Sequence, residues 1–263
     1  MKLPNIAIAG LLSVTVGVAF QTAQAQAQNV LDWEQIAQDG EWVSGQQSGS
    51  FQIGGGTVDI DFGLGGNSQF SDFDSPVTPD VNSVINGSDG DDDRTLHVQI
   101  DSANVDPAAN FVSMVTSFSG FGGPLTGVSF DVLDVDIAED LTWQDQVSIT
   151  GFLNGVEVAP VFNIFDNTTT AQVDANTVAG IQNSPNTDAD GGNVAVSFAG
   201  AIDSFELIYT DGPDTAVDNP KRHGISIGDI SFDAQPVSEP AALLSLGAFA
   251  VAGLLVKRKR VHS

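Results

Sequence analysis

Short segments with a side-chain period of two constrain the fold of this chain more than any other feature. Leu96–Ile100, Val194–Phe198 and Phe205–Tyr209 alternate apolar with polar residues, the pattern of a half-buried strand. Further strand candidates are Ser50–Ile53, Thr57–Phe62, Phe111–Phe118, Gly127–Ile137, Val147–Ile149, Val156–Phe165, Ile225–Ile227 and Ile230–Phe232. Gly, Asn, Asp and Pro clusters separate these segments, and Asn154-Gly155 between two apolar runs is a hairpin signal.

This pattern predicts an all-β fold with little helix. Roughly ten short strands favour a two-sheet antiparallel sandwich, jelly-roll-like, with one face of each sheet buried. Leu31–Gln38 is the one plausible short helix, and Gly63–Ser71 and Asp72–Asp93 are expected to be loops. We treat residues 28–236 as a single Asp-rich β-sandwich domain.

The charge and the cysteine content exclude whole classes of function. The 263-residue chain has 34 acidic and 8 basic residues, a formal charge of −26 and no cysteine. Proteins that bind nucleic acid need clustered Lys and Arg to displace counterions from phosphates, so we expect no nucleic-acid partner. Disulfides, thiol chemistry and zinc–thiolate sites are excluded because the chain has no thiol.

The N-terminal segment has the features of a Sec-type signal peptide. A short positive start, Met1-Lys2, precedes the uncharged apolar run Ile6–Phe20. Small residues follow in the A-x-A pattern at Ala23–Ala25 and at Ala25–Ala27, where a signal peptidase would cut. We therefore expect residues 1–27 to be removed during export.

The C-terminal segment, residues 237–263, has three parts. The apolar run Ala241–Val256 follows the motif Val237, Ser238, Glu239 and Pro240, and is followed by Lys257, Arg258, Lys259 and Arg260. Its 16 residues are fewer than the roughly 20 that usually cross a bilayer as a single hydrophobic helix, and the basic cluster would hold the C-terminus on the cytoplasmic side. This order of parts resembles the PEP-CTERM sorting tail, whose usual signature is V-P-E-P; here Ser238 replaces the first proline.

The resemblance implies a route out of a Gram-negative-type bacterium. Proteins with this tail are handled by exosortase in bacteria that make extracellular polysaccharide, and the tail is removed near the motif. The implied partners are the Sec translocon, an exosortase-type sorting enzyme and, transiently, the inner membrane; the implied destination is the cell surface or the extracellular matrix. Without both ends, residues 28–237 hold 33 acidic residues against three basic ones, Arg94, Lys221 and Arg222.

Aspartates in the middle of the chain are candidate calcium ligands. Asp134 and Asp136 lie two residues apart in an expected strand and would share one face, and Asp145 follows a short loop. Glu139 and Asp140 in that loop are candidate additions. Converging carboxylates repel one another unless protonated or neutralised, and Ca²⁺ takes about six to eight oxygen ligands. We predict a calcium site here; the alternative is the polar edge of an acidic surface.

Two other acidic stretches favour solvated loops. Asp89–Asp93 places carboxylates as an EF-hand loop begins, but Arg94 and Ile100 stand where that loop needs glycine and glutamate. Asp188–Gly192 is typical of a turn. Weak calcium binding is the alternative for both stretches.

The catalytic motifs lack the sequence context that they need, so we predict no catalytic residue. Gly224–Gly228 satisfies G-x-S-x-G around Ser226, yet a nucleophile elbow needs a strand, a turn and a helix, and β alternation resumes after Gly228. We expect Ser226 and His97 to face outward from strands and His223 to lie in a loop. No zinc-ligand spacing surrounds either histidine.

Aromatic residues leave a second function open. Trp33, Trp42, Trp143 and Tyr209 could form a sugar-stacking platform, although core packing is the more general role of large aromatics. Trp143 is the best candidate for exposure and ligand stacking, because it follows the acidic strand in a loop. The leading hypothesis is a non-enzymatic exported surface or matrix protein stabilised by calcium. A carbohydrate-binding module on exopolysaccharide is the alternative, and a secreted hydrolase is the third.

Overall fold

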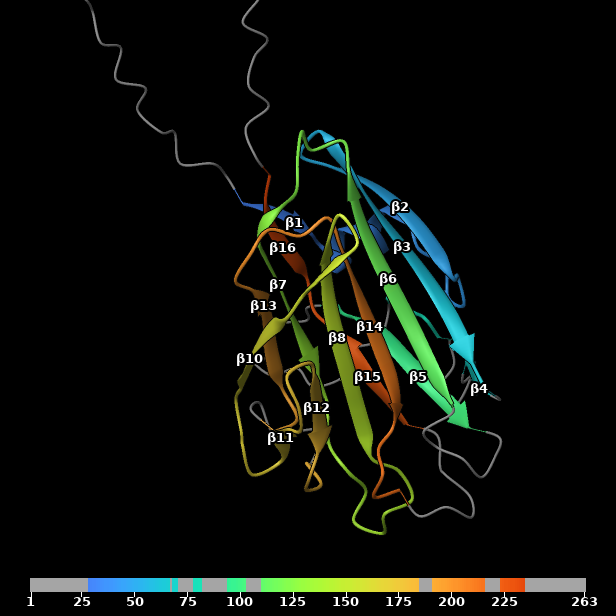
Figure 1. Ribbon diagram of the computed structural model, residues 1–263. Helices are drawn as coiled ribbons and strands as arrows, with labels where there is room; N and C mark the ends of the chain where they lie inside the picture. The colour runs from blue at the N-terminus through green and yellow to red at the C-terminus, as the bar shows by residue number, and fades with distance from the viewer. Residues whose placement is uncertain are drawn as a thin grey trace, which may run out of the picture.

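Two antiparallel sheets packed face to face form an all-β sandwich. The computed structural model describes residues 28–66, 68–70, 78–81, 94–102, 110–184, 191–215 and 223–234. Figure 1 shows the two layers, with β8, β14 and β6 in front of β7, β15 and β5. The all-β two-sheet prediction is therefore confirmed. No helix within the described ranges is long and apolar enough to cross a membrane.

The first sheet is organised around β7 (Thr126–Leu133). One edge of β7 pairs with β13 (Val194–Phe198), and the other pairs first with β16 (Ile230–Asp233) and then with β15 (His223–Ile227). The remaining strands of this sheet are β1 (Asn29–Leu31), β4 (Ser68–Phe70), β5 (Leu96–Ser102) and β10 (Pro160–Ile164).

The second sheet has the order β11-β12-β8-β14-β6-β3-β2, with β9 beside β8. Its strands are β2 (Ser48–Ile53), β3 (Gly56–Gly65), β6 (Phe111–Ser119), β8 (Asp145–Leu153), β9 (Val156–Val158), β11 (Thr170–Gln172), β12 (Thr177–Gly180) and β14 (Ser204–Asp211). β8 and β14 lie side by side along their length, from Ser204↔Phe152 to Asp211↔Asp145.

The expected short helix is present as α1 (Trp33–Asp39). The side chain of Asp32 caps its first turn by accepting a hydrogen bond from the N–H of Gln35, and Gly40 ends it in the left-handed conformation. Trp33 is fully buried and its indole N–H donates to the carbonyl of Gly228, which fixes the helix against the end of β15.

Alternation along the strands builds the core between the sheets. β13 follows the pattern buried, half-buried, buried, half-buried, buried, as its sequence predicts, and every second residue of β8 is buried through Gly151. Phe130 of β7 stacks on Phe205 of β14 at 4.8 Å between ring centroids and joins the two sheets. The hydrophobic core thus lies between the two layers.

Three expected segments differ from the structure. Gly127–Ile137 is not one strand, because β7 ends at Leu133 where Asp134 takes φ 70. Val156–Phe165 is two strands: β9 pairs with β8, and β10, which begins at Pro160, pairs with β13 in the opposite sheet. Gly63–Ser71 is not a loop, because β3 continues to Gly65 and β4 pairs with β5.

The long loop expected at Asp72–Asp93 is described only from Thr78 to Val81. There Asp80 forms a β-bridge with His97, and Val81 is fully buried. The motif Asp89–Asp93 lies outside the described residues, as do Asp188, the signal peptide, and the sorting motif and basic cluster of residues 237–263.

The two ends of the described sandwich lie side by side. β1 pairs antiparallel with β16, and Asn29 is opposite Phe232. Asp233 is opposite Thr126, at the start of β7. The chain therefore enters and leaves at the end of the sandwich where β7 begins (Figure 1).

Candidate functional site

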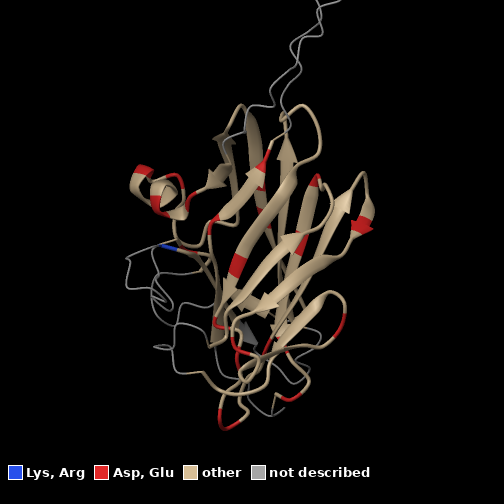
Figure 2. Ribbon diagram, turned by 90° about the vertical axis from the view of Figure 1, so that its left-hand side faces the viewer, with Lys and Arg blue, Asp and Glu red and all other residues tan. Residues whose placement is uncertain are grey.

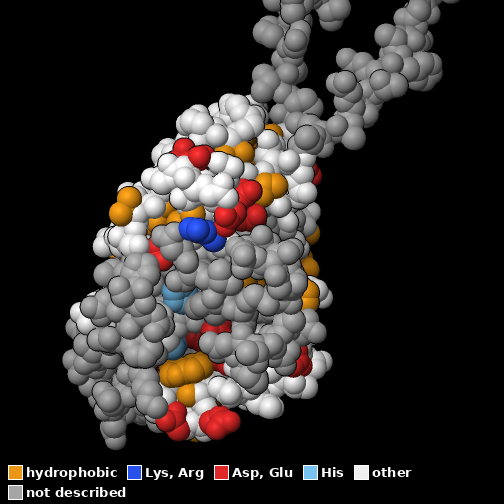
Figure 3. Space-filling view, turned by 180° about the vertical axis from the view of Figure 1, so that it is seen from behind, with side chains coloured by type: hydrophobic (Ala, Val, Ile, Leu, Met, Phe, Trp, Pro, Cys, Tyr) orange, Lys and Arg blue, Asp and Glu red, His pale blue; other side chains and the backbone are white. Residues whose placement is uncertain are grey.

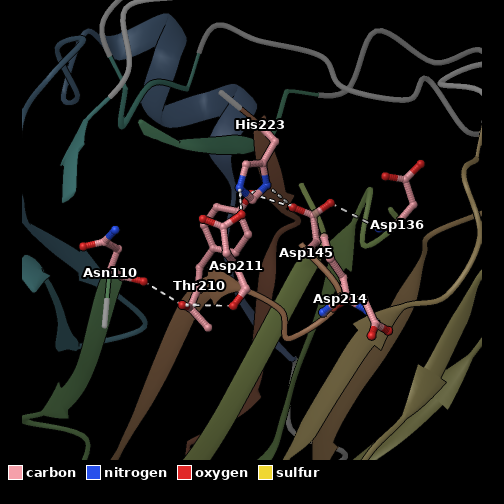
Figure 4. A network of polar contacts seen from close by, with 9 residues as sticks. Asn110, Asp136, Asp145, Thr210, Asp211, Asp214 and His223 are labelled. Carbon is pink, nitrogen blue, oxygen red and sulfur yellow. Dashed lines mark hydrogen bonds and ion pairs between the residues drawn. The ribbon is translucent and has the colours of Figure 1, made fainter. Parts of the chain in front are cut away.

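A buried polar cluster occupies the opposite end, where β7 ends. Its side chains come from both sheets: Asp134 and Asp136 follow β7, Asp145 begins β8, Asp211 ends β14 and His223 begins β15. Figure 4 shows Asp136, Asp145, Asp211 and His223 of this cluster. Asp136, Asp145 and Asp211 are each at most 2% exposed. Carboxyl groups at such depth are rare in proteins unless they are paired.

His223 is the centre of this cluster. Its Nδ1 lies 2.6 Å from Oδ1 of Asp145, and its Nε2 lies 2.9 Å from Oδ1 of Asp211. The hydroxyl of Tyr209 donates to the same Oδ1 of Asp145 at 2.6 Å and contacts Nδ1 of His223. The imidazole therefore joins β8 and β14 of one sheet to β15 of the other.

The two aspartates keep His223 protonated. Burial alone lowers the pKa of His223, but the charges and hydrogen bonds of Asp145 and Asp211 outweigh it and raise that pKa to about 9. The pKa of Tyr209 is raised well above its usual value, by burial first and then by the charge of Asp145, so the phenol stays neutral. His223 is therefore an imidazolium that lies between the carboxyl groups of Asp145 and Asp211.

The turn after β7 places Asp134 and Asp136 beside this group. The N–H of Asp136 donates to Oδ2 of Asp145 at 3.2 Å, and the N–H of Asp145 donates to the carbonyl of Asp136 at 2.9 Å. Oδ2 of Asp136 accepts a hydrogen bond from the N–H of Ser184 at 2.6 Å. The backbone N–H of Asp134 points to Oδ1 of Asn193 at 3.4 Å.

Asp134 and Asp136 have strongly perturbed acidities. Burial, followed by the charge of Asp145, raises the pKa of Asp134 to about 7 and that of Asp136 to about 8. The charge of Asp134 also acts on Asp136. Both carboxyl groups therefore give up their protons near neutral pH rather than near pH 4.

The structure brings three of the five expected calcium ligands together. Asp134, Asp136 and Asp145 interact, although Asp134 and Asp136 are held by a turn and not by one strand face. Glu139 and Asp140 are exposed in the loop between β7 and β8, and Asp140 accepts hydrogen bonds from Thr142. Within the described part of the chain, no three His, Asp or Glu side chains form a ready metal centre.

Trp143 lies beside the cluster and lines a groove. Its ring stacks on His223 at 5.5 Å between centroids with 6° between the planes, an arrangement in which the indole faces a cation. The groove has a volume of about 350 Å³ and is lined by Ala138, Glu139, Asp140, Thr142, Trp143 and Asn183. Figure 3 shows hydrophobic side chains flanked by acidic ones toward this end of the molecule.

The other aromatics expected as platform candidates are core residues. Trp33 and Tyr209 are fully buried, and Trp42 is 3% exposed. Trp42 packs against Trp33 edge-on and stacks on Phe51, so these rings fill the sandwich beneath α1. Trp143 is thus the member of the expected set that faces a groove.

Ser226 and His97 are both buried, contrary to the expectation that they face outward. Ser226 is 0% and His97 3% exposed. Nδ1 of His97 lies 3.0 Å from the carbonyl of Ile225 and 3.3 Å from Oγ of Ser226. Ser226 lies inside β15, so it does not occupy the strand-to-helix turn of a nucleophile elbow.

His223 begins β15 and does not lie in a loop as expected, and Tyr209 and Asp211 belong to the cluster although no sequence motif marks them as site residues. The contacts of Asp145 with Tyr209 and His223 span 64 and 78 residues of sequence, so no local spacing shows them. One feature of the sequence does point to them. Tyr209 and Asp211 lie at the end of a predicted strand, and in a sandwich the end of a strand lies beside the end of a neighbouring strand, which here is the start of β8.

Acidic residues gather near this end of the molecule. Figure 2 shows them in the loops at the lower end, and also on α1 and on individual strands. Arg94 is the one Lys or Arg among the described residues, and its Nε lies 3.1 Å from Oε2 of Glu34, away from the cluster.

Comparisons with known proteins do not assign a family. No family model and no curated protein matches the chain. Among solved structures, an arabinose-bound GH51 α-L-arabinofuranosidase is similar, with a TM-score of 0.28 and 11% identity over 65% of this chain. The match spans 22% of that enzyme chain. The matched part is thus a minor portion of a much longer protein.

Proposed function

We propose that this is a non-enzymatic exported protein of the cell surface or extracellular matrix, sorted by the PEP-CTERM-like tail of residues 237–263. The placement of the chain ends and of the Trp143 groove at opposite ends of the sandwich supports the proposal. The segments before Asn29 and after Phe232 leave from one end, and the Trp143 groove lies at the other. A domain held through its C-terminal segment would present that groove to the surroundings.

The charge of the exported part supports the same proposal. Its 33 acidic residues against three basic ones keep the protein soluble outside the cell and repel other polyanions. Since the chain has no cysteine, its core and its cross-sheet polar cluster must stabilise it without disulfides.

Removal of the tail tests this proposal in the producing bacterium. We expect a chain that ends at Val237 to be released into the medium, because it lacks the motif, the apolar run and the basic cluster. A full-length variant Glu239→Ala keeps the apolar run and is expected to stay in the membrane fraction unprocessed. Immunodetection in the medium, surface and membrane fractions separates these cases. Surface retention of the truncated chain would exclude tail-dependent sorting.

The Trp143 groove favours carbohydrate binding as a second candidate function. It combines an aromatic ring with the carboxylates of Glu139 and Asp140 and the amide of Asn183, groups that can stack on a sugar and accept or donate hydrogen bonds to its hydroxyls. Its volume, about 350 Å³, lies in the usual range of ligand sites. The acidic lining favours neutral over anionic polysaccharides.

Affinity electrophoresis in gels that contain soluble neutral glucans or galactans tests this candidate. The wild-type protein should be retarded, and Trp143→Ala should lose most of the retardation. Leu141→Ala is the matched control, because Leu141 is 45% exposed in the same loop and does not line the groove. Equal retardation of wild type and Trp143→Ala would remove the groove as the binding site.

A further inference from the structure

The buried cluster contains more acid than base. Four carboxyl groups, those of Asp134, Asp136, Asp145 and Asp211, accompany the one imidazole of His223. One imidazole can pair with at most two of these four groups, those of Asp145 and Asp211. Unpaired buried charge is costly, so protons or a cation must offset it.

Two oxygens distinguish between these two possibilities. Asp136 is 2% exposed, and while its Oδ2 accepts from Ser184, its Oδ1 is shielded from solvent and has no hydrogen-bond partner among the described residues. Oδ1 of Asp134 is likewise shielded from solvent and has no hydrogen-bond partner within the described part of the chain. A protonated carboxyl would need an acceptor for its proton, whereas a bound cation satisfies both oxygens directly.

The backbone that carries both residues is held in place. A Cβ on Gly180 would lie 2.0 Å from the carbonyl carbon of Asp136, and one on Gly192 would lie 3.1 Å from Cα of Asp134. The chain of β12 and the turn before β13 therefore lie directly against this segment. The N–H of Val135 between the two aspartates donates to the carbonyl of Gly192 at 2.8 Å. The backbone that carries the two carboxylates is thus fixed by contacts within the protein.

We infer that one Ca²⁺ ion binds after β7, with Oδ1 of Asp134 and Oδ1 of Asp136 as its carboxylate ligands and with backbone carbonyls and water completing its shell. Ca²⁺ fits because it takes about six to eight oxygens in a flexible geometry, whereas Mg²⁺ requires a near-ideal octahedron. Asp145 is not a ligand, because Tyr209, His223 and the N–H of Asp136 engage its oxygens. The inference holds for the isolated domain and does not depend on tail-dependent sorting.

Calcium titration of residues 28–237 tests the inference, since this fragment contains both described sheets and the whole described core. Isothermal titration after EGTA treatment should show one site per chain, with a Kd of about 10⁻⁴–10⁻³ M as in extracellular modules. At about 100 times that Kd, linkage predicts a rise in melting temperature of roughly 5–10 °C over EGTA at equal ionic strength. Mg²⁺ should give a clearly smaller rise.

Matched variants locate the site. The double variant Asp134→Asn, Asp136→Asn should lose the calcium-dependent rise but melt in EGTA at or above the wild-type temperature, because its amides carry no charge. Asn tolerates the left-handed φ of Asp134, so this variant keeps the turn. Asp61→Asn removes an exposed carboxylate from β3 and should keep the full rise. Absence of calcium binding by the wild type, an unchanged rise in the double variant, or an equal response to Mg²⁺ would each overturn the inference.

Discussion

Gly180 shows, at the scale of single residues, how tightly the end of the sandwich is packed. It lies buried in β12, and a Cβ there would come within 2.0 Å of the backbone of Asp136, an atom that cannot rotate away. We expect Gly180→Ala to lower the free energy of unfolding by about 1–3 kcal/mol or more, as overpacking does. Urea denaturation of residues 28–237 measures the change.

Gly123→Ala is the control for this substitution. Gly123 is exposed, has no atom within 4 Å of the added Cβ and does not need a positive φ, so its replacement should change the stability by less than about 0.5 kcal/mol. If Gly180→Ala were as stable as Gly123→Ala, the backbone of Asp136 would not be held by β12 as described.

Single residues also show what the sequence can and cannot predict of the site. The acid-rich run around Asp134, Asp136 and Asp145 is visible locally, because these residues lie within 12 positions of one another. Tyr209 joins them only through the pairing of β8 with β14, and His223 only because β15 of the first sheet faces β8 of the second, where His223 contacts Asp145. Burial raises the pKa of Tyr209, whereas the charges and hydrogen bonds of Asp145 and Asp211 raise that of His223 against the effect of burial. A one-dimensional pattern contains neither the burial nor these contacts.

At the scale of elements, α1 depends on its cap. The helix has seven residues, too few to be stable alone, and Asp32 satisfies the N–H of Gln35 at its start. Asp32→Ala should cost about 1 kcal/mol and lower the melting temperature by roughly 2–4 °C. Asp39→Ala, at the other end of α1, removes an exposed contact with Gln35 and should cost less than about 0.5 kcal/mol. Equal losses would mean that capping is not the cause.

Strands were predictable where turn chemistry marks their limits. Asn154 and Gly155 both adopt positive φ between β8 and β9, as the hairpin signal requires. The sequence marks the change of sheet between β9 and β10 less clearly. Pro160 is compatible with the first residue of a strand, where no N–H donor is needed, but it does not show which sheet that strand joins. The end of β7 could not be read from alternation, because Asp134 to Ile137 keeps the period of two after the backbone has turned.

At the scale of the whole molecule, net charge opposes the fold. Residues 28–237 carry 33 acidic residues against three basic ones, so long-range repulsion acts across the entire sandwich. The surface pair of Arg94 and Glu34, with both side chains 36% exposed, contributes about 0–1 kcal/mol at most. Salt shortens the screening length from about 10 Å at 0.1 M to about 3 Å at 1 M, and it should therefore weaken far more repulsion than attraction.

We therefore expect the melting temperature of residues 28–237 in EGTA to rise steadily as NaCl increases from 0.05 to 1 M. A chloride salt is the appropriate choice, because sulfate would also strengthen apolar burial. The double variant Asp134→Asn, Asp136→Asn should respond nearly as much as wild type, since it keeps most of the net charge. A saturating calcium effect on top of this gradual response would separate site binding from screening. A melting temperature that is flat or falls with NaCl would show that local contacts, and not net charge, limit the stability of this sandwich.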